Sequence, residues 1–300
     1  MRAHVVFASD KIFVEHLAVA LCSLFKCNPN VSFNVYVFNA DIDGASWRRL
    51  SEIADRFGHS LIDIKILDRD IEGLFTSQSY TRAIYYRLFI PEKLDFDKVL
   101  YLDSDIVVNG SIEDLYNTNI DGFYMAAVAD AVPNPHKDLG MSEGSKYFNS
   151  GVILFNLPKW REGRVKEKVI ELIRNKPWAI QFPDQCGINA IVNGRWKELH
   201  PKYNAQSIFF QVKFEDTRSE LYPDGQLLEA IKDPVIIHYS GKQKPWHLGY
   251  KHRFRKLYWK YQRETNINRH SRAENRIANF LILCVRKLNK EVHKLMPHRS

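Results

Sequence analysis

The chain has 300 residues, of which 45% are hydrophobic, and its formal net charge is +8. This length and composition indicate a globular protein with one large domain, or one domain and an appendage. No apolar stretch reaches the roughly 18 residues that a membrane-spanning helix needs. The N-terminal residues lack the apolar core of a signal peptide and are expected to form a first strand. The scattered cysteines Cys22, Cys27, Cys186 and Cys284 show no metal or disulfide spacing, which predicts a reduced, cytoplasmic setting.

The positive charge is concentrated at the C-terminal end of the chain. Residues 251–300 contain fourteen Lys or Arg against three Glu, a net charge of +11, so residues 1–250 carry about −3. The basic character therefore belongs to a terminal segment and not to the body of the fold.

Strand and helix patterns alternate through the first part of the chain. Strands are predicted over residues 4–8, 32–38 and 61–67, and helices over residues 14–25 and 44–57. This alternation favours an α/β fold whose first half resembles a nucleotide-binding half-sheet. The first strand ends in Ser9-Asp10, and ligands of such sheets bind at the carboxyl ends of strands.

The next two predicted elements are a helix over residues 79–89, stopped by Pro91, and an apolar strand over residues 98–108. Arg87 lies among aromatic and apolar residues, so a buried position with an anionic partner is expected. Asp103 and Asp105 interrupt the apolar strand and share one face if the strand continues through them. Two adjacent carboxylates suit Mg²⁺ or Mn²⁺, although a solvated turn at a strand end would also explain them.

Polar residues recur at element ends in the second half. A strand over residues 123–128 ends at Asp130, a long loop is expected over residues 133–146, and Asn149-Ser150-Gly151 leads into a strand over residues 152–157. A helix is predicted over residues 159–175. Asp184-Gln185 opens a short helix over residues 186–192, which Asp184 could simply cap.

A last strand over residues 234–239 carries His238 at its end. A histidine in this position is often structural. The Gly241 and Lys244 that follow suit a phosphate group, however, which favours a role in ligand binding.

Four motifs in this order resemble those of a known family. They are Leu102-Asp103-Ser104-Asp105, Phe148-Asn149-Ser150-Gly151-Val152, Asp184-Gln185, and His238-Tyr239-Ser240-Gly241 followed by Lys244-Pro245-Trp246. With the N-terminal Phe-Ala-x-Asp, they resemble the retaining glycosyltransferases of family 8, and most closely the bacterial lipooligosaccharide and lipopolysaccharide galactosyl- and glucosyltransferases. The resemblance implies a GT-A type α/β domain with a mixed, mainly parallel sheet flanked by helices, which we place over residues 1–265. The pattern of residues 266–300 predicts a helical tail.

The resemblance also implies roles for individual residues. It implies a Mn²⁺ or Mg²⁺ site formed by Asp103, Asp105 and His238. It implies donor contacts from Ala8, Asp10, Phe13, Arg87, Asp103, Ser104, Asn149, Ser150, Gly241 and Lys244. It implies catalytic-centre positions for Gln185, Asp184 and Asp130. One departure is Ile12, which stands where the family places a polar Asn.

The implied reaction moves a hexose, galactose or glucose, from a UDP-sugar to a saccharide acceptor such as lipopolysaccharide core or another lipid-linked glycan. A divalent cation and a lysine would neutralise the charge that develops on departing UDP. Retention by a covalent intermediate needs a nucleophile, and the amide of Gln185 is a poor one. We therefore expect attack from the face that the leaving group vacates.

The tail predicts an interaction with a membrane surface. Apolar and basic residues of 269–295 recur at helical spacing on different faces, as in helices that lie on anionic bilayers. This pattern indicates a cytoplasmic enzyme that is peripheral at the inner face of the cytoplasmic membrane. A helix docked on the protein's own body is the alternative, and no nucleic-acid motif is present.

Two other functions compete with glycosyl transfer. A haloacid-dehalogenase-type phosphohydrolase would use Asp103 as its nucleophile, but its Asp-x-Asp strand usually comes earlier in the core. A non-catalytic UDP-sugar-binding protein would keep Asp10 and Lys244 without needing a full set of metal ligands.

Overall fold

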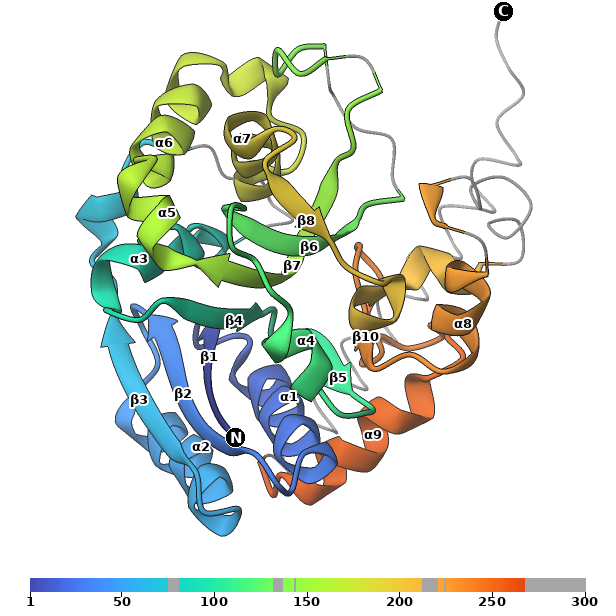
Figure 1. The fold of residues 1–300 in the computed structure, drawn as a ribbon. Helices are drawn as coiled ribbons and strands as arrows, with labels where there is room; N and C mark the ends of the chain where they lie inside the picture. The colour runs from blue at the N-terminus through green and yellow to red at the C-terminus, as the bar shows by residue number, and fades with distance from the viewer. Residues whose placement is uncertain (75–80, 132–136, 143, 212–220, 224, 268–300) are drawn as a thin grey trace, which may run out of the picture.

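The computed structural model describes residues 1–74, 81–131, 137–142, 144–211, 221–223 and 225–267 (Figure 1). The strands are β1 Arg2–Ala8, β2 Ser32–Asn39, β3 Ser60–Lys65, β4 Lys98–Leu102, β5 Ile106–Val108, β6 Met125–Ala129, β7 Phe148–Asn156, β8 Trp196–Glu198, β9 Ala205–Gln206 and β10 Ile236–His238. The α-helices are α1 Val14–Cys27, α2 Gly44–Arg56, α3 Ile90–Lys93, α4 Glu113–Asn117, α5 Leu157–Glu162, α6 Val165–Asn175, α7 Pro183–Val192, α8 Gln226–Lys232 and α9 Arg255–Glu264. The 3₁₀ helices are η1 Asp68–Ile71, η2 Arg82–Phe89, η3 Pro177–Ala179, η4 Pro201–Asn204 and η5 Ser207–Phe210.

The described strands form a seven-stranded sheet in the order β3-β2-β1-β4-β7-β6-β8 and a three-stranded sheet in the order β5-β10-β9. In the larger sheet β7 runs antiparallel to both of its neighbours, and the other pairings are parallel. This arrangement confirms the predicted mixed, mainly parallel sheet. The predicted strand-helix alternation of residues 4–67 is also confirmed, with shifts of a few residues at the ends.

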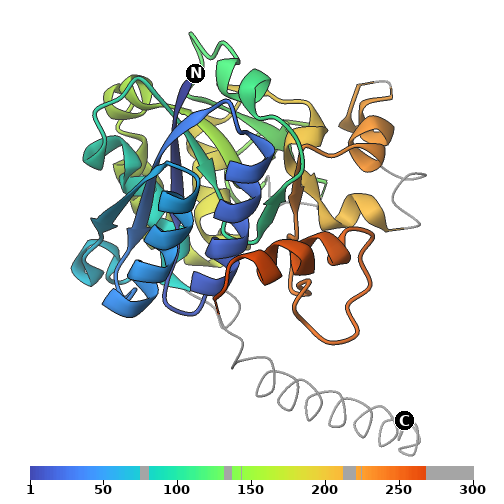
Figure 2. The ribbon, with the colours of Figure 1, turned by 90° about the horizontal axis from the view of Figure 1, so that it is seen from below.

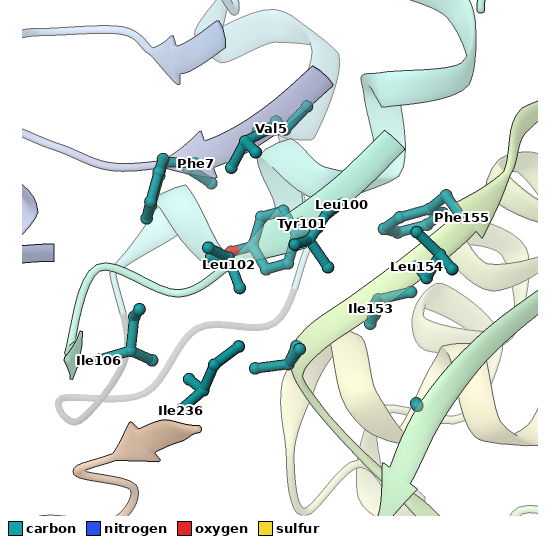
Figure 3. Close-up of a cluster of buried hydrophobic side chains, with 14 of the residues drawn as sticks. Val5, Phe7, Leu100, Tyr101, Leu102, Ile106, Ile153, Leu154, Phe155 and Ile236 are labelled. Atoms are coloured by element: carbon teal, nitrogen blue, oxygen red, sulfur yellow. The ribbon is translucent and has the colours of Figure 1, made fainter. Parts of the chain in front are cut away.

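An apolar block supports the centre of the larger sheet (Figure 3). It joins β1, β4 and β7 through side chains that are fully buried: Val5, Phe7, Leu100, Tyr101, Leu102, Ile153, Leu154 and Phe155. Burial of a large apolar side chain contributes about 1.5–3 kcal/mol, so this block is a stable base for the loops that leave it. Figure 3 shows that the chain passes directly from Leu102 out of the sheet towards Ile106.

The strand predicted over residues 98–108 is two strands, which is a correction. β4 ends at Leu102, and β5 begins at Ile106 in the other sheet, antiparallel to β10. Residues 103–105 form a turn, in which their polar side chains bond to Arg87, to the Ala8 carbonyl and to Lys244. The argument that Asp103 and Asp105 share a face of one strand is therefore wrong, although the turn still brings them together.

Two predicted helices also differ. Pro91 does not stop the helix, because it lies in the first turn of α3, where a missing N–H costs nothing. The segment before it is the 3₁₀ helix η2, and Ser79 lies outside the described residues. The helix predicted over residues 159–175 is α5 and α6, separated at Arg164, whose φ is 48°.

Helices α1 and α9 lie side by side on the outside of the sheets (Figures 1 and 2). Within the described residues, no helix is long and apolar enough to cross a membrane. The predicted tail helix lies almost entirely in residues 268–300, outside the described residues, so the boundary at residue 265 stays a prediction. Residues 133–136 and 143 of the predicted long loop also lie outside them.

Candidate functional site

Three side chains that could hold a cation meet where β4 and β10 end. Atoms of Asp103, Asp105 and His238 that could serve as ligands all lie within 4.8 Å of one another. His238 Nε2 is 3.7 Å from Asp103 Oδ2 and 3.4 Å from Asp105 Oδ1. The register explains the meeting, because His238 pairs with Ile106, the residue directly after Asp105. The structure thus brings together the three residues that the sequence suggested as ligands.

Gly151 allows the side chains of His238 and Asp103 to pack directly against the backbone of β7. A Cβ atom on Gly151 would lie 2.3 Å from His238 Cε1 and 2.8 Å from Asp103 Oδ2. Its carbonyl also accepts a hydrogen bond from the Asp103 N–H at 2.8 Å, which fixes the turn to β7. Two carboxylates and an imidazole that converge in this way fit a divalent cation such as Mn²⁺ or Mg²⁺.

Arg87 connects this cluster to the next one. Its Nη2 donates to Asp103 Oδ1 at 2.8 Å, its Nη1 donates to the Ser150 carbonyl at 2.6 Å, and its Nε lies 3.2 Å from Asp184 Oδ2. Burial opposes the charge, but Asp103 and Asp184 raise the pKa of the guanidinium above its usual value. Burial raises the pKa of the Asp184 carboxyl, although Arg87 partly opposes this shift. The expectation of a buried Arg87 with an anionic partner is confirmed.

Lys244 approaches the cluster from the loop after β10. Its ammonium donates to Asp105 Oδ2, and also to the Tyr239 carbonyl at 2.7 Å. Burial alone would raise the pKa of the Asp105 carboxyl, but Lys244 and His238 outweigh it and hold this pKa well below its usual range. Asp105 is thus a carboxylate at neutral pH, next to a cation that could face an anionic ligand.

A buried amide network lies on the other side of His238. His238 Nδ1 is 2.9 Å from Asn204 Oδ1, and Asn204 Nδ2 donates to Asn149 Oδ1 at 2.9 Å. Asn149 Nδ2 donates to Asp130 Oδ2 at 3.2 Å. The same Asp130 oxygen accepts a hydrogen bond from Gln185 Nε2 at 2.9 Å.

Gln185 is held at both ends of its amide. Its Oε1 accepts the Ser150 N–H at 2.9 Å, while its Nε2 donates to Asp130. Both Asp130 and Gln185 are buried. A carbonyl oxygen that already accepts a backbone N–H is poorly suited to act as a nucleophile. This arrangement agrees with the expectation that the amide of Gln185 is a poor nucleophile.

The remaining residues of the predicted site lie near the ends of β1 and β10. Ser104 Oγ donates to the Ala8 carbonyl at 3.2 Å. Asp10 Oδ1 accepts the backbone N–H groups of Ile12 at 2.9 Å and Phe13 at 3.0 Å, so this carboxylate stabilises the turn before α1. Ile12 is 68% exposed. Gly241 has a φ of +84°, a conformation that favours glycine and allows the turn that leads to Lys244.

Three side chains of the site escaped sequence reasoning. Tyr101 donates its hydroxyl to Asp103 Oδ1 at 2.7 Å, and Asn204 contacts His238. His16 stacks on Trp246 at 3.4 Å between ring centroids. Asn204 and His16 depend on partners in elements that are distant in sequence, so no local pattern marks them. Tyr101 lies only two residues before Asp103, but within its apolar strand it resembles the other core residues. Only the aromatic content of residues 196–210 and 246 offered a hint.

Comparisons with known proteins identify relatives of this chain. The family model described as Glycosyl transferase family 8 matches residues 4–248. General stress protein A of Bacillus subtilis (strain 168) is 31% identical over 272 residues, covering 88% of this chain and 94% of that protein. Lipopolysaccharide 1,2-glucosyltransferase of Escherichia coli (strain K12) is 26% identical and covers 81% of this chain and 72% of that protein.

The crystal structure of galactosyltransferase LgtC in complex with donor and acceptor sugar analogues matches the fold. Its TM-score is 0.81 at 23% identity, and the match covers 91% of this chain and 99% of that chain. This likeness confirms the GT-A type α/β fold.

Proposed function

Because the chain belongs to glycosyltransferase family 8, we propose that it transfers a hexose, galactose or glucose, from a UDP-sugar to a saccharide acceptor. One observation carries the proposal: Asp103, Asp105 and His238 meet beside Lys244, where the absence of a side chain at Gly151 lets His238 and Asp103 approach the backbone. A site for a divalent cation next to a lysine suits a diphosphate leaving group.

Asp103, Asp105 and His238 would hold Mn²⁺ or Mg²⁺, and the imidazole nitrogen favours Mn²⁺. The bound cation would neutralise the charge that develops on the diphosphate. The Lys244 ammonium, which donates to Asp105 Oδ2, would also contact a phosphate oxygen of the donor. Ala8, Asp10 and Phe13 would face the nucleoside, because they follow the carboxyl end of β1.

The buried polar residues beyond Arg87 would bind the hexose. Arg87 and Asp184 would orient sugar hydroxyls, with Asn149 and Ser150 on β7 next to them. The fixed amide of Gln185 supports attack by the acceptor from the leaving-group face, with retention of configuration. The departing phosphate oxygen would take the acceptor proton.

The acceptor is proposed to be a lipid-linked glycan such as lipopolysaccharide core. A relative named as a lipopolysaccharide glucosyltransferase and the basic tail support this proposal. Helix α9, which precedes the tail, exposes Lys256, Lys260 and Arg263 while burying Tyr258 and Tyr261. The protein would then act in the cytoplasm, peripheral at the inner face of the membrane. Deletion of residues 268–300 should abolish binding to anionic vesicles and spare donor hydrolysis, whereas unchanged binding would contradict the membrane role.

The two competing functions differ from glycosyl transfer in what they would release from a UDP-sugar. A haloacid-dehalogenase-type phosphohydrolase would release inorganic phosphate, and membership of family 8 does not favour it. A non-catalytic binder would release nothing from a UDP-sugar.

The test is a panel of UDP-sugars with Mn²⁺, followed by UDP release and by thermal shift. UDP-galactose or UDP-glucose should raise the melting temperature and yield UDP, since a ligand that binds the folded state stabilises it. Release of inorganic phosphate, or binding without turnover in the presence of saccharide acceptors, would contradict the proposal.

A further inference from the structure

We propose that Asn204 is a positioning residue that orients His238 for the cation. Asn204 is fully buried, and its Oδ1 lies 2.9 Å from His238 Nδ1. It directly precedes β9, whose Gln206 pairs with His238 in parallel register, so the backbone brings the two side chains together. The inference deepens the proposed function and rests on it, because it concerns the same cation site.

The direction of the hydrogen bonds determines which nitrogen carries the proton. Asn204 uses its Nδ2 to donate to Asn149 Oδ1, an atom that also accepts the Gly151 N–H at 3.0 Å. Asn204 Oδ1 is therefore left to accept a hydrogen bond, and its partner is the N–H at His238 Nδ1. The imidazole then keeps the lone pair of Nε2, the atom that faces Asp103 and Asp105.

The row of donors ends on a carboxylate. His238 donates to Asn204, Asn204 donates to Asn149, and Asn149 donates to Asp130 Oδ2. An amide in the reverse orientation would place two donors or two acceptors face to face at one of these steps. The buried Asp130 thus fixes both amides, and through them the ring of His238. Groups that orient a ligating imidazole in this way commonly change metal affinity about 10- to 100-fold when removed.

The experiment measures Mn²⁺ affinity of the full-length protein by titration calorimetry, without donor or acceptor. Asn204→Ala removes the acceptor, and Asn204→Leu removes it while filling the volume. Both should weaken Mn²⁺ binding about 10- to 100-fold. Asn204→Asp keeps an oxygen for His238 Nδ1 and should bind Mn²⁺ more tightly than the Ala and Leu variants, which would show rescue by the acceptor.

The matched control is Gln206→Ala on the same short strand. Gln206 is also buried, but its Nε2 donates to the Ala129 carbonyl at 2.9 Å and not to the imidazole. This variant should keep the Mn²⁺ affinity of the wild type. Equal affinity in Asn204→Ala and wild type, or an equal loss in Gln206→Ala, would overturn the role of Asn204.

A measurement on the unaltered protein covers the case in which the variants fail to fold. Long-range ¹H–¹⁵N NMR of the metal-free protein, labelled at histidine, should show the neutral ring of His238 protonated at Nδ1 and not at Nε2. Protonation at Nε2 would overturn the inference. If the wild type binds neither Mn²⁺ nor Mg²⁺, both the proposed function and this inference are overturned. If the wild type binds Mn²⁺ and the Asn204 variants bind it equally well, only the inference is overturned.

Discussion

Asp103 and Asp105 have different partners although one residue separates them. Arg87 and Tyr101 both donate to one oxygen of Asp103, whereas Lys244 donates to one oxygen of Asp105. Each carboxylate thus has one oxygen paired with the protein and the other directed towards His238. This division leaves one oxygen from each aspartate for a cation.

The close packing of His238 and Asp103 against Gly151 gives the first prediction at this scale. Gly151→Ala should reduce Mn²⁺-dependent UDP release more than the roughly 10- to 100-fold expected for loss of an outer contact, because its Cβ would meet the ring of His238 and Asp103 Oδ2. Steady-state turnover with increasing Mn²⁺ is the measurement. Gly44→Ala is the control, because at Gly44 the nearest side-chain atom is 3.9 Å from the added Cβ. A Gly151→Ala enzyme with the wild-type response to Mn²⁺ would show that the close packing of His238 and Asp103 against Gly151 has no role in cation binding.

The ion pair of Arg87 with Asp184 gives a prediction about stability. Their side chains are 4% and 7% exposed, so Arg87→Met leaves a buried carboxylate without its cation. We expect a loss of about 3–5 kcal/mol in the free energy of unfolding, measured by urea denaturation. Lys26→Met, which breaks the exposed pair with Glu264, should cost less than about 1 kcal/mol. Similar losses in the two variants would contradict this account of Arg87.

Residues of the site differ in how far the sequence could reveal them. Asp103, Asp105 and Arg87 stand in apolar surroundings, where a charge needs a partner, so their importance was predictable. Asn204 was not, because its role depends on the pairing of β9 with β10, and the surrounding sequence is aromatic without clear period.

Helix α9 supports the loop that carries Lys244. Arg255 Nε donates to the Pro245 carbonyl at 2.8 Å, and Arg255 Nη2 donates to the His247 carbonyl at 3.2 Å. Trp259 Nε1 donates to the same Pro245 carbonyl at 3.1 Å. The helix therefore holds the backbone on both sides of Trp246, next to the proposed diphosphate site.

Loss of these hydrogen bonds should weaken nucleotide binding. A hydrogen bond contributes about 1 kcal/mol, and Arg255→Met loses two of them, so it should raise the Kd for UDP about 10-fold, measured by titration calorimetry with Mn²⁺. Lys256→Met removes the same charge from the exposed side of α9 and should leave the Kd unchanged. An unchanged Kd in Arg255→Met, or an equal rise in both variants, would contradict the role of α9.

The contact between α1 and α9 gives a prediction about pH. His16 stacks on Trp246 and contacts the Tyr258 hydroxyl at 2.7 Å, and burial lowers the pKa of its imidazole from 6.5 to about 3. The unfolded chain binds a proton in this interval that the folded chain does not. The free energy of unfolding should therefore fall as the pH decreases below 6.5.

Urea denaturation at pH 7.5 and at pH 4.5, in EDTA, measures this dependence. His16→Phe should show a smaller fall than the wild type. Asp105, Lys244 and His247 also act on His16, and His252, whose pKa is lowered to about 4, contributes equally to both proteins. An identical fall in the free energy of unfolding of the two proteins would contradict this account, because it would mean that His16 binds protons equally in the folded and unfolded states.

Element boundaries were predictable where the hydrophobic periodicity and the turn-forming residues at the element ends agreed, as in β1, α1 and β2. The division between β4 and β5 was not predictable, because both sides of Asp103-Ser104-Asp105 are equally apolar and local alternation cannot assign a strand to a sheet. The extra turn after Pro91 also needed tertiary packing, since proline is equally compatible with ending a helix and with beginning one.

The whole molecule places its chemistry where two sheets meet. Asp103 directly follows β4 of the seven-stranded sheet, and His238 is the last residue of β10 in the three-stranded sheet. The first strands and helices follow the order of a nucleotide-binding half-sheet, and β7, with Asn149 to Gly151, runs antiparallel beside β4. A cation bound here would bridge the two sheets, so its loss should affect both binding and the arrangement of the site.

The most direct test of the central claim compares UDP release by the wild type and by Asp105→Asn, with UDP-galactose and UDP-glucose, at saturating Mn²⁺. The wild type should turn over one of these donors only when the cation is present. Asp105→Asn should lose this activity while keeping the far-UV circular dichroism of the wild type. Turnover by Asp105→Asn at the wild-type rate would contradict the proposal that this turn is the cation site of a UDP-hexose-dependent glycosyltransferase.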